Sequence, residues 1–184
     1  MEECDLSQEF PIQNEMDYLY FGGPYPDGVI EFFPAGSEGF KPRKIPARLL
    51  VADAFGKTKI ETFPRCLSVL PDSGCQLTER WAKLVFDLSG SDFRRFTCTA
   101  GLSADLGFKN EVRGNVNFQV LGDESVLFER KEMRGGETAV SLDLDLRGRK
   151  KLTLLVRGEH RIQEEFWLGH FIWGNPRLSK KQES

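Results

Sequence analysis

The sequence predicts an all-β fold, and more closely an antiparallel β-sandwich of the jelly-roll type. Hydrophobic and polar residues alternate over many short runs, which is the period of a strand with one buried face. Turn signals rich in Gly, Pro, Ser and Asp separate these runs at short intervals. No stretch keeps the spacing of an amphipathic helix over several turns, so strands are expected to carry the fold.

The clearest alternation lies in residues 93–123 and predicts two strands joined by a loop. In the first strand the buried phase comprises Phe96, Cys98, Ala100 and Leu102. In the second strand it comprises Val116, Phe118 and Val120. The polar stretch 103–114 lies between them and is expected to be a loop. Two half-buried strands of this kind are the units from which a sandwich core is built.

Further runs on both sides predict the remaining strands. The upstream runs span residues 47–55, 57–63 and 81–88, and the last of them places Leu84, Phe86 and Leu88 inward. The downstream runs span residues 125–133, 139–146, 150–156 and 165–178. Run 139–146 is typical of an antiparallel sheet with one solvent-exposed face, because its leucines alternate with Ser141, Asp143 and Asp145. The final run is apolar on both faces, so we expect Trp173 to be a core residue.

These runs divide the chain into three parts. Residues 1–44 form an aromatic, Gly- and Pro-rich N-terminal arm, residues 45–180 form the sandwich, and residues 181–184 form a polar tail. Two interpretations of the arm are open. Its aromatic side chains either cover the surface of the domain or form a platform for a ligand.

Composition argues against several function classes. The net charge of −3 lacks the basic excess of a duplex-binding protein, which disfavours nucleic acid as a partner. No apolar run approaches the length of a membrane span, so none is predicted. The acidic start MEECDLSQEF does not resemble a secretory signal, so we expect an intracellular protein or a mature chain. The short basic turns, Arg149-Lys150-Lys151 among them, are expected to be solvated surface.

The four cysteines do not form a CxxC pair, and the chain has two histidines, so a zinc site is poorly supported. Cys98 lies in the buried phase of its strand and is expected to be a small core residue. Cys66 and Cys75 flank the turn-like Pro71-Asp72-Ser73-Gly74, and a disulfide between them stays open.

Four segments in order resemble the NPCBM family, the "novel putative carbohydrate-binding module", which is related to carbohydrate-binding module family fifty-one. They are LVFDLSGSDFRRFTCTAGL, GNVNFQVLGDESVLFE, MRGGETAVSLDLDLRGRKKLTLLV and HFIWGNPRL, and the resemblance covers roughly residues 70–179. The sequence departs from the family pattern at three places. Ser103-Ala104 stands where the family commonly has an acidic pair, Glu79-Arg80 replaces His-Ala, and Ile172 replaces an acid.

The resemblance implies a jelly-roll sandwich similar to galactose-binding domains and a non-catalytic role in binding glycans, with a galactose-like terminal sugar as the expected ligand. It also implies a secreted or extracytoplasmic setting, although the sequence itself leaves the compartment undetermined. The alternative is a protein-interaction or assembly module that keeps the fold and has lost the sugar site. The departures from the family pattern favour that alternative.

A sugar site needs an aromatic face for the ring and a few fixed polar groups for its hydroxyls. The candidates near loops are Trp81, Asp105, Asn110, Glu165, Trp167 and His170. Each also has a structural interpretation, as a core residue for Trp81 and His170 or as ordinary loop polarity for Asp105 and Asn110. Structural calcium is common in related sandwiches and stays an open possibility near Asp105.

Motifs for catalysis are missing from the sequence. It has no GxSxG, HExxH, Walker or GxGxxG motif, so an enzyme is not predicted. Glu164 and Glu165 are neighbours in a predicted strand and would point to opposite faces, so they are not expected to flank one glycosidic bond.

Overall fold

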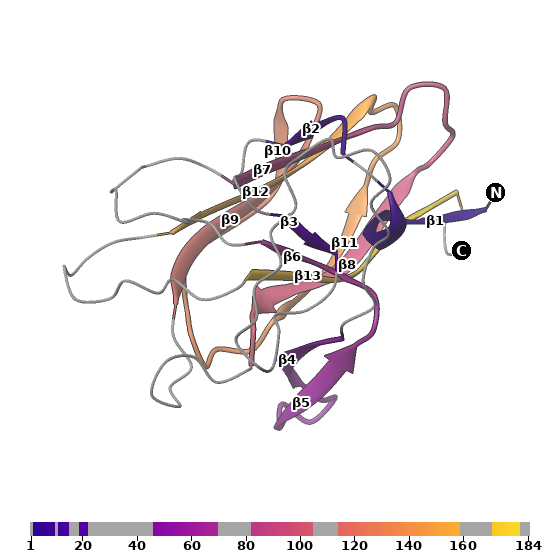
Figure 1. Ribbon diagram of the computed structural model, residues 1–184. Coiled ribbons are helices and arrows are strands. Elements are labelled where there is room, and N and C mark those ends of the chain that lie inside the picture. Colours follow the sequence, from indigo (N-terminus) through magenta and orange to yellow (C-terminus); the bar gives the residue numbers. More distant parts are fainter. Residues whose placement is uncertain are drawn as a thin grey trace.

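The computed structural model describes residues 2–9, 11–14, 19–21, 46–69, 82–104, 114–158 and 171–180. In this part of the chain the fold is almost entirely β, with one turn of 3-10 helix, η1 (Leu6–Gln8). Two antiparallel sheets face each other, and a separate two-stranded hairpin lies below them in Figure 1. The predicted all-β sandwich is confirmed. None of the described helices is long and apolar enough to cross a membrane.

The first sheet has the strand order β11-β8-β13-β6-β3, and β1 also pairs with β13. Its strands are β11 (Val140–Asp145), β8 (Arg95–Leu102), β13 (Phe171–Ser179), β6 (Cys66–Val69), β3 (Leu19–Phe21) and β1 (Glu3–Asp5). The second sheet has the order β10-β9-β12-β7-β2. Its strands are β10 (Ser125–Arg134), β9 (Asn115–Gly122), β12 (Lys151–Gly158), β7 (Ala82–Asp87) and β2 (Gln13–Asn14).

The main core fills the space between the two sheets. Its members include the predicted inward residues Leu84, Phe86, Leu88, Phe96, Cys98, Ala100, Leu102, Val116, Phe118, Val120, Leu152, Leu154 and Val156. Phe118 lies at the centre, and its ring centroid is 4.8 Å from that of Phe171 and 5.7 Å from that of Trp173. Aromatic pairs in tilted and edge-on arrangements stabilise such a core beyond the area that they bury.

A second, smaller core lies on the outer face of the first sheet, where the hairpin of β4 (Ala47–Ala52) and β5 (Thr58–Phe63) packs. Its buried residues are Ala47, Leu49, Val51, Phe63, Cys66 and Ile172. β13 therefore has Phe171 and Trp173 in the main core and Ile172 in the small one. This explains why the final run is apolar on both faces, as the sequence indicated.

Three short strands of the N-terminal part pair with both sheets. β1 pairs with the end of β13, β2 pairs with β7, and β3 pairs with β6. The division into an arm of residues 1–44 and a sandwich of residues 45–180 stays a prediction, because residues 22–45 lie outside the described part. Within residues 3–21, the backbone completes the edges of both sheets.

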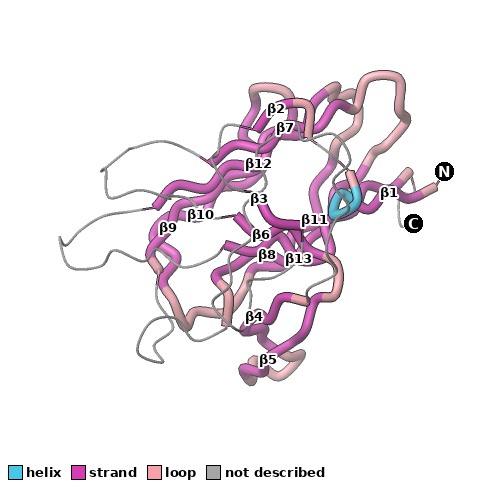
Figure 2. The backbone as a smooth tube through the Cα atoms, viewed as in Figure 1, coloured by secondary structure: helices cyan, strands magenta, loops and turns pink. Residues whose placement is uncertain are grey.

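The sandwich has two distinguishable ends (Figures 1 and 2). At one end the turns 88–94 and 147–150 lie against each other, and the described ends of the chain lie on the same side. We call this the turn end. At the other end lie the strand termini Val69, Leu102 and Phe171 of the first sheet and Ala82, Val116 and Gly158 of the second. We call this the loop end.

Candidate functional site

The six predicted site residues, Trp81, Asp105, Asn110, Glu165, Trp167 and His170, all lie outside the described residues. The described strands nevertheless show where the chain enters and leaves the segments that contain them. Ala82 follows Trp81 directly, and Phe171 follows His170 directly. The segment 105–113 begins three residues after the end of β8 and ends just before β9.

The strand termini next to these three segments converge at the loop end. Phe171 pairs with both Val69 and Leu102 in the first sheet. Val156 pairs with Ala82, and Gly158 pairs with Val116, in the second sheet. Segments far apart in sequence therefore start and finish at one end of the sandwich, which is how a loop-built ligand site is assembled on a rigid scaffold.

Ser103 and Ala104, which stand in place of the acidic pair, are both 7% exposed. Leu49 of β4 forms a bridge with Ser103, and the Ala104 amide donates a hydrogen bond of 2.7 Å to the Arg48 carbonyl. The small side chains fit beneath the hairpin, where a pair of carboxylates would be removed from water at a considerable cost. This position therefore serves the packing of β4 and does not offer open ligand oxygens.

Two asparagines at the start of β9 were not singled out from the sequence. Asn117 is 9% exposed, and its Oδ1 accepts a hydrogen bond of 2.8 Å from the Glu132 amide, at a bulge in β10 where Glu132 has a φ of 52°. Asn115 lies at the loop end, and its Oδ1 is buried without a hydrogen-bond partner among the described residues. In the run GNVNFQV both asparagines alternate with the apolar residues, so the sequence predicts that they face outward. This alternation does not predict that their side chains are buried.

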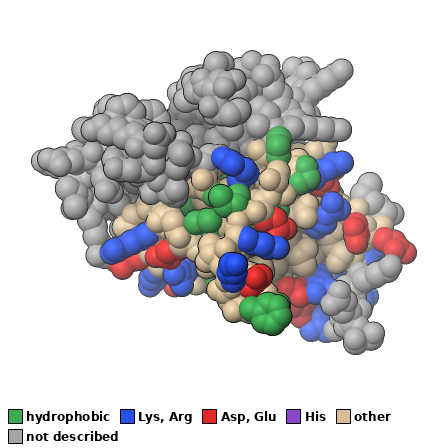
Figure 3. All heavy atoms as spheres, turned by 90° about the horizontal axis from the view of Figure 1, so that it is seen from below, with side chains coloured by type: hydrophobic (Ala, Val, Ile, Leu, Met, Phe, Trp, Pro, Cys, Tyr) green, Lys and Arg blue, Asp and Glu red, His purple; other side chains and the backbone are tan. Residues whose placement is uncertain are grey.

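The tryptophan predicted to be structural is confirmed as such. Trp173 is fully buried, with its ring centroid 5.0 Å from that of Phe171 in an edge-on contact. It therefore offers no surface to a ligand. On the face that carries the hairpin, Figure 3 shows hydrophobic side chains in separate places among charged ones. The large hydrophobic residues that are well exposed include Phe55 at 95% and Ile60 at 55%.

The cysteines and acids of the described part do not form a metal centre. Cys4, Cys66 and Cys98 carry thiols, and Cys75 lies outside the described residues. Burial raises the pKa of the Cys66 thiol to about 12 and also raises that of Cys98, so both stay protonated. Among the described residues no three His, Cys, Asp or Glu side chains are grouped to hold a metal. Asp105, near which calcium was considered, lies outside the described residues.

A comparison with the sequence profiles of protein families shows to which family the chain belongs. Residues 77–179 match the sequence profile described as the NPCBM/NEW2 domain, which is more than half of the chain. The chain belongs to the NPCBM/NEW2 family. The resemblance seen in four separate segments is therefore confirmed. A comparison with curated proteins finds no match for this NPCBM/NEW2 chain.

Solved structures with the same fold are modules of carbohydrate-binding family CBM51. One is the CBM51 of a Clostridium perfringens GH95 protein in complex with methyl-galactose, with a TM-score of 0.68, 15% identity and coverage of 96% of this chain and 99% of that one. Another is CBM51-2 of C. perfringens ZmpB in complex with GlcNAc, with a TM-score of 0.64, 17% identity and coverage of 97% and 31%. The tandem CBM51 modules of Sp3GH98 from Streptococcus pneumoniae give a TM-score of 0.64, 15% identity and coverage of 98% and 47%.

The NPCBM/NEW2 chain spans 31% of the first ZmpB structure that it matches, which contains CBM51-2 and INT domains. At these identities the likeness to solved structures establishes the shared sandwich. The family match and these structures together relate the chain to carbohydrate-binding modules.

Proposed function

We propose that this NPCBM/NEW2 domain binds a neutral, galactose-like terminal sugar at the loop end and does so without catalysis. The observation that carries the proposal is the convergence of the strand termini next to all six candidate residues. Val69, Ala82, Leu102, Val116, Gly158 and Phe171 meet at this end of the two sheets. Related modules with the same fold have been solved with methyl-galactose and with GlcNAc, which supports a sugar as the ligand class.

The roles of the candidate residues follow from the chemistry of a pyranose. Trp81 and Trp167 are proposed to stack on the C–H face of the ring, because a flat aromatic surface matches that face. Asp105, Asn110, Glu165 and His170 are proposed to bond the hydroxyl groups. Such a site fixes the orientation of the sugar and requires no bond to be broken, so the domain would hold a glycan for chemistry done elsewhere.

Calorimetric titration with methyl-galactose tests the proposal. We expect saturable binding by the unmodified chain and a loss of affinity of about fivefold or more in Trp81→Ala or Trp167→Ala, because one aromatic stacking face contributes on the order of 1–3 kcal/mol. Phe55→Ala is the matched control, since Phe55 is an aromatic residue that is 95% exposed on the hairpin. Unchanged affinity in both tryptophan variants would show that these residues are not part of the site.

The alternative is an interaction module that retains the fold without sugar binding, and one observation favours it. Ser103 and Ala104 are buried under β4 where the family commonly has acids. A glycan array separates the two functions. Binding of at least one sugar class supports the carbohydrate module, and a folded protein that binds none of the glycans supports the interaction module.

A further inference from the structure

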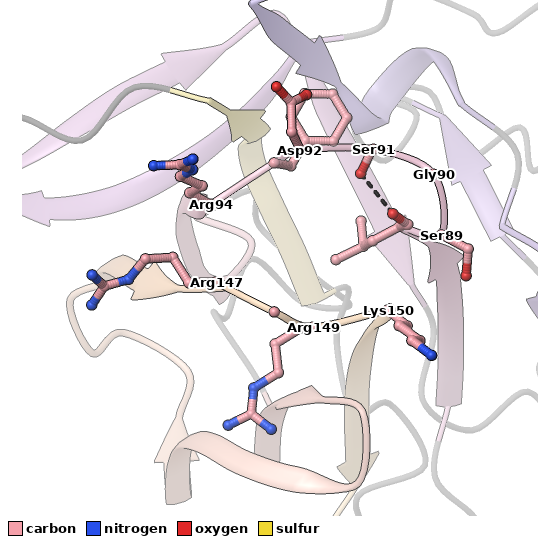
Figure 4. A pocket seen from close by; sticks show the side chains of 11 residues that line it. Ser89, Gly90, Ser91, Asp92, Arg94, Arg147, Arg149 and Lys150 are labelled. Carbon is pink, nitrogen blue, oxygen red and sulfur yellow. Dashed lines mark hydrogen bonds between the residues drawn. The ribbon is translucent and has the colours of Figure 1, made fainter.

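A pocket of about 710 Å³ lies at the turn end, on the opposite side of the sandwich from the proposed sugar site. Its walls are the turn 88–94, between β7 and β8, and the turn 147–150, between β11 and β12 (Figure 4). The sequence marked the second turn as a solvated basic surface. The structure brings it against the first turn, so that two turns, each connecting one sheet to the other, line one open pocket.

Backbone hydrogen bonds tie the two walls together. The Leu88 amide donates to the Lys150 carbonyl over 2.8 Å, and the Leu146 amide donates to the Arg94 carbonyl over 2.8 Å. Within the first wall, the Ser91 hydroxyl donates to the Leu88 carbonyl over 2.7 Å, as the dashed line in Figure 4 shows. These bonds hold the pocket in shape before a ligand arrives, which lowers the entropic cost of binding.

The pocket is lined by the cations Arg94, Arg147, Arg149 and Lys150, and by a single carboxylate, Asp92. Asp92 is already paired with Lys180, over 2.5 Å, and Arg147 is paired with Asp145. Arg149 is 3.9 Å from the nearest carboxylate oxygen of Asp123, so that pair is loose.

Lys180, helped by Arg94, lowers the pKa of the Asp92 carboxyl, although neither Arg94 nor Lys150 forms an ion pair within the described part. With four cations and one carboxylate, the lining keeps an excess of positive charge. The chain as a whole carries −3, so this excess is a local feature that net charge does not explain. The guanidinium groups of Arg94 and Arg147 extend to one side of the pocket, and Lys150 extends to the other (Figure 4). Arg94 comes from the first turn and Arg147 from the second, so an anionic group bound on their common side would meet donors from both turns (Figure 4).

Apolar side chains complete the wall. Leu88 and the half-buried Phe93 line the same space, and Phe93 also packs against the main core. Arginine binds planar and tetrahedral oxyanions with paired N–H groups, and an apolar wall suits the C–H face of a sugar ring. We propose that this pocket is a second saccharide site, which takes a sugar bearing a sulfate or carboxylate group.

Titrations followed by amide NMR test this proposal, with galactose 6-sulfate, glucuronic acid, galactose and inorganic sulfate as probes. We expect the two acidic sugars to shift the amides of Gly90 and Gly148 in the two turns, with galactose and inorganic sulfate at least about tenfold weaker there. No shift of these amides with either acidic sugar would overturn the proposal. Inorganic sulfate binding as tightly as galactose 6-sulfate would overturn the saccharide part of it.

Variants assign the effect to the pocket. Arg94→Gln with Arg149→Gln should weaken the acidic sugar by about tenfold or more, because two charge-assisted contacts are lost. Lys59→Gln is the control, since it removes one charge from a side chain that is 59% exposed on β5. Lys150→Gln is a second pocket variant if the double variant misfolds. If Lys59→Gln lowered the affinity for the acidic sugar equally, the cause would be the overall charge of the protein and not the pocket. That result would contradict the proposal.

The two sites can be tested separately. Methyl-galactose affinity should be unchanged in Arg94→Gln/Arg149→Gln if that sugar binds only at the loop end. If methyl-galactose does not bind, the proposal of an acidic-sugar site at the turn end is unaffected. If the acidic sugars do not bind, the proposal of a neutral-sugar site at the loop end is unaffected.

Discussion

Gly174 shows how one residue fixes the position of the β4–β5 hairpin. A Cβ atom at this position would lie 2.8 Å from Cδ1 and 2.9 Å from Cγ of Phe63, and 3.1 Å from the Thr99 carbonyl oxygen. The ring of Phe63 therefore rests on the bare backbone of β13, which only glycine allows. This close approach lets the small core form on the outer face of the first sheet.

We expect Gly174→Ala to destabilise the protein by about 1–3 kcal/mol, because an inserted methyl group must displace a buried ring. Chemical denaturation gives the change in the free energy of unfolding. Phe63→Leu supplies the partner for a double-mutant cycle, and the double variant should lose less than the sum of the two single variants. If the losses of stability in the two single variants add up to the loss in the double variant, the two residues are not in contact.

The thiols offer a second test at the scale of residues. Burial raises the pKa of Cys66 from 9.0 to about 12, so the folded state favours the neutral thiol. Stability is therefore unaffected below about pH 9 and falls as the pH rises from 9 towards 12, because the unfolded chain ionises first. At pH 8 we expect Cys66 and Cys98 to react with a thiol reagent only after denaturant is added. Rapid labelling of both in the native protein would contradict their burial.

At the scale of elements, the inward phases of the strands were predictable, and their partners were not. The period of two in residues 93–123 identified Phe96, Cys98 and Phe118 as core residues, and each is 5% exposed or less. Two features depend on contacts between distant segments. They are the pairing of β1 with β13 and the packing of the hairpin against Ile172. Local alternation carries no information about such contacts, because it records only which face is buried.

The hairpin has its own core, so we expect it to open without unfolding of the sandwich. Leu49 is fully buried in that core, and Leu49→Ala should cost about 2–5 kcal/mol. Hydrogen exchange should then accelerate in β4 and β5 more than in β9 and β12. Leu154→Ala, in the main core, is the comparison and should accelerate exchange in both sheets. Equal acceleration everywhere in Leu49→Ala would show that the hairpin is not a separate unit.

The turn after β11 depends on an exposed ion pair. The Arg147 side chain and amide donate to Asp145 and lower the pKa of that carboxyl from 3.8 to about 2. A lowered pKa means that this contribution is present above pH 3.8 and is lost as the pH falls through about 2. An NMR titration of the Asp145 carboxyl should show this midpoint, and Arg147→Gln should raise it. A midpoint near 3.8 in the unmodified protein would contradict the pair.

At the scale of the whole molecule, the sandwich separates two ends with different chemistry. The strand termini that flank the predicted aromatic and polar residues lie at the loop end. The turn end carries a pocket rich in arginine and lysine. The sequence predicted the first set of residues because aromatic and polar side chains near loops suit a sugar, once the family resemblance had suggested glycan binding. It did not predict the second site, because Arg94 and Arg149 are far apart in sequence and only the packing of two turns brings them together.

The departures from the family pattern also need the whole fold for their explanation. From the sequence, Ser103-Ala104 suggested a lost sugar site. In the structure the two residues are covered by β4, so their small size has a packing reason. The sequence could not separate these two causes, because both favour a small uncharged residue.

Chemical-shift mapping with methyl-galactose tests the central claim most directly. We expect the largest backbone shifts beside the loop-end strand termini Ala82, Leu102, Val116 and Phe171, with the turns 88–94 and 147–150 unaffected. Saturating shifts confined to those two turns, or none anywhere at millimolar sugar, would contradict a galactose-like site at the loop end.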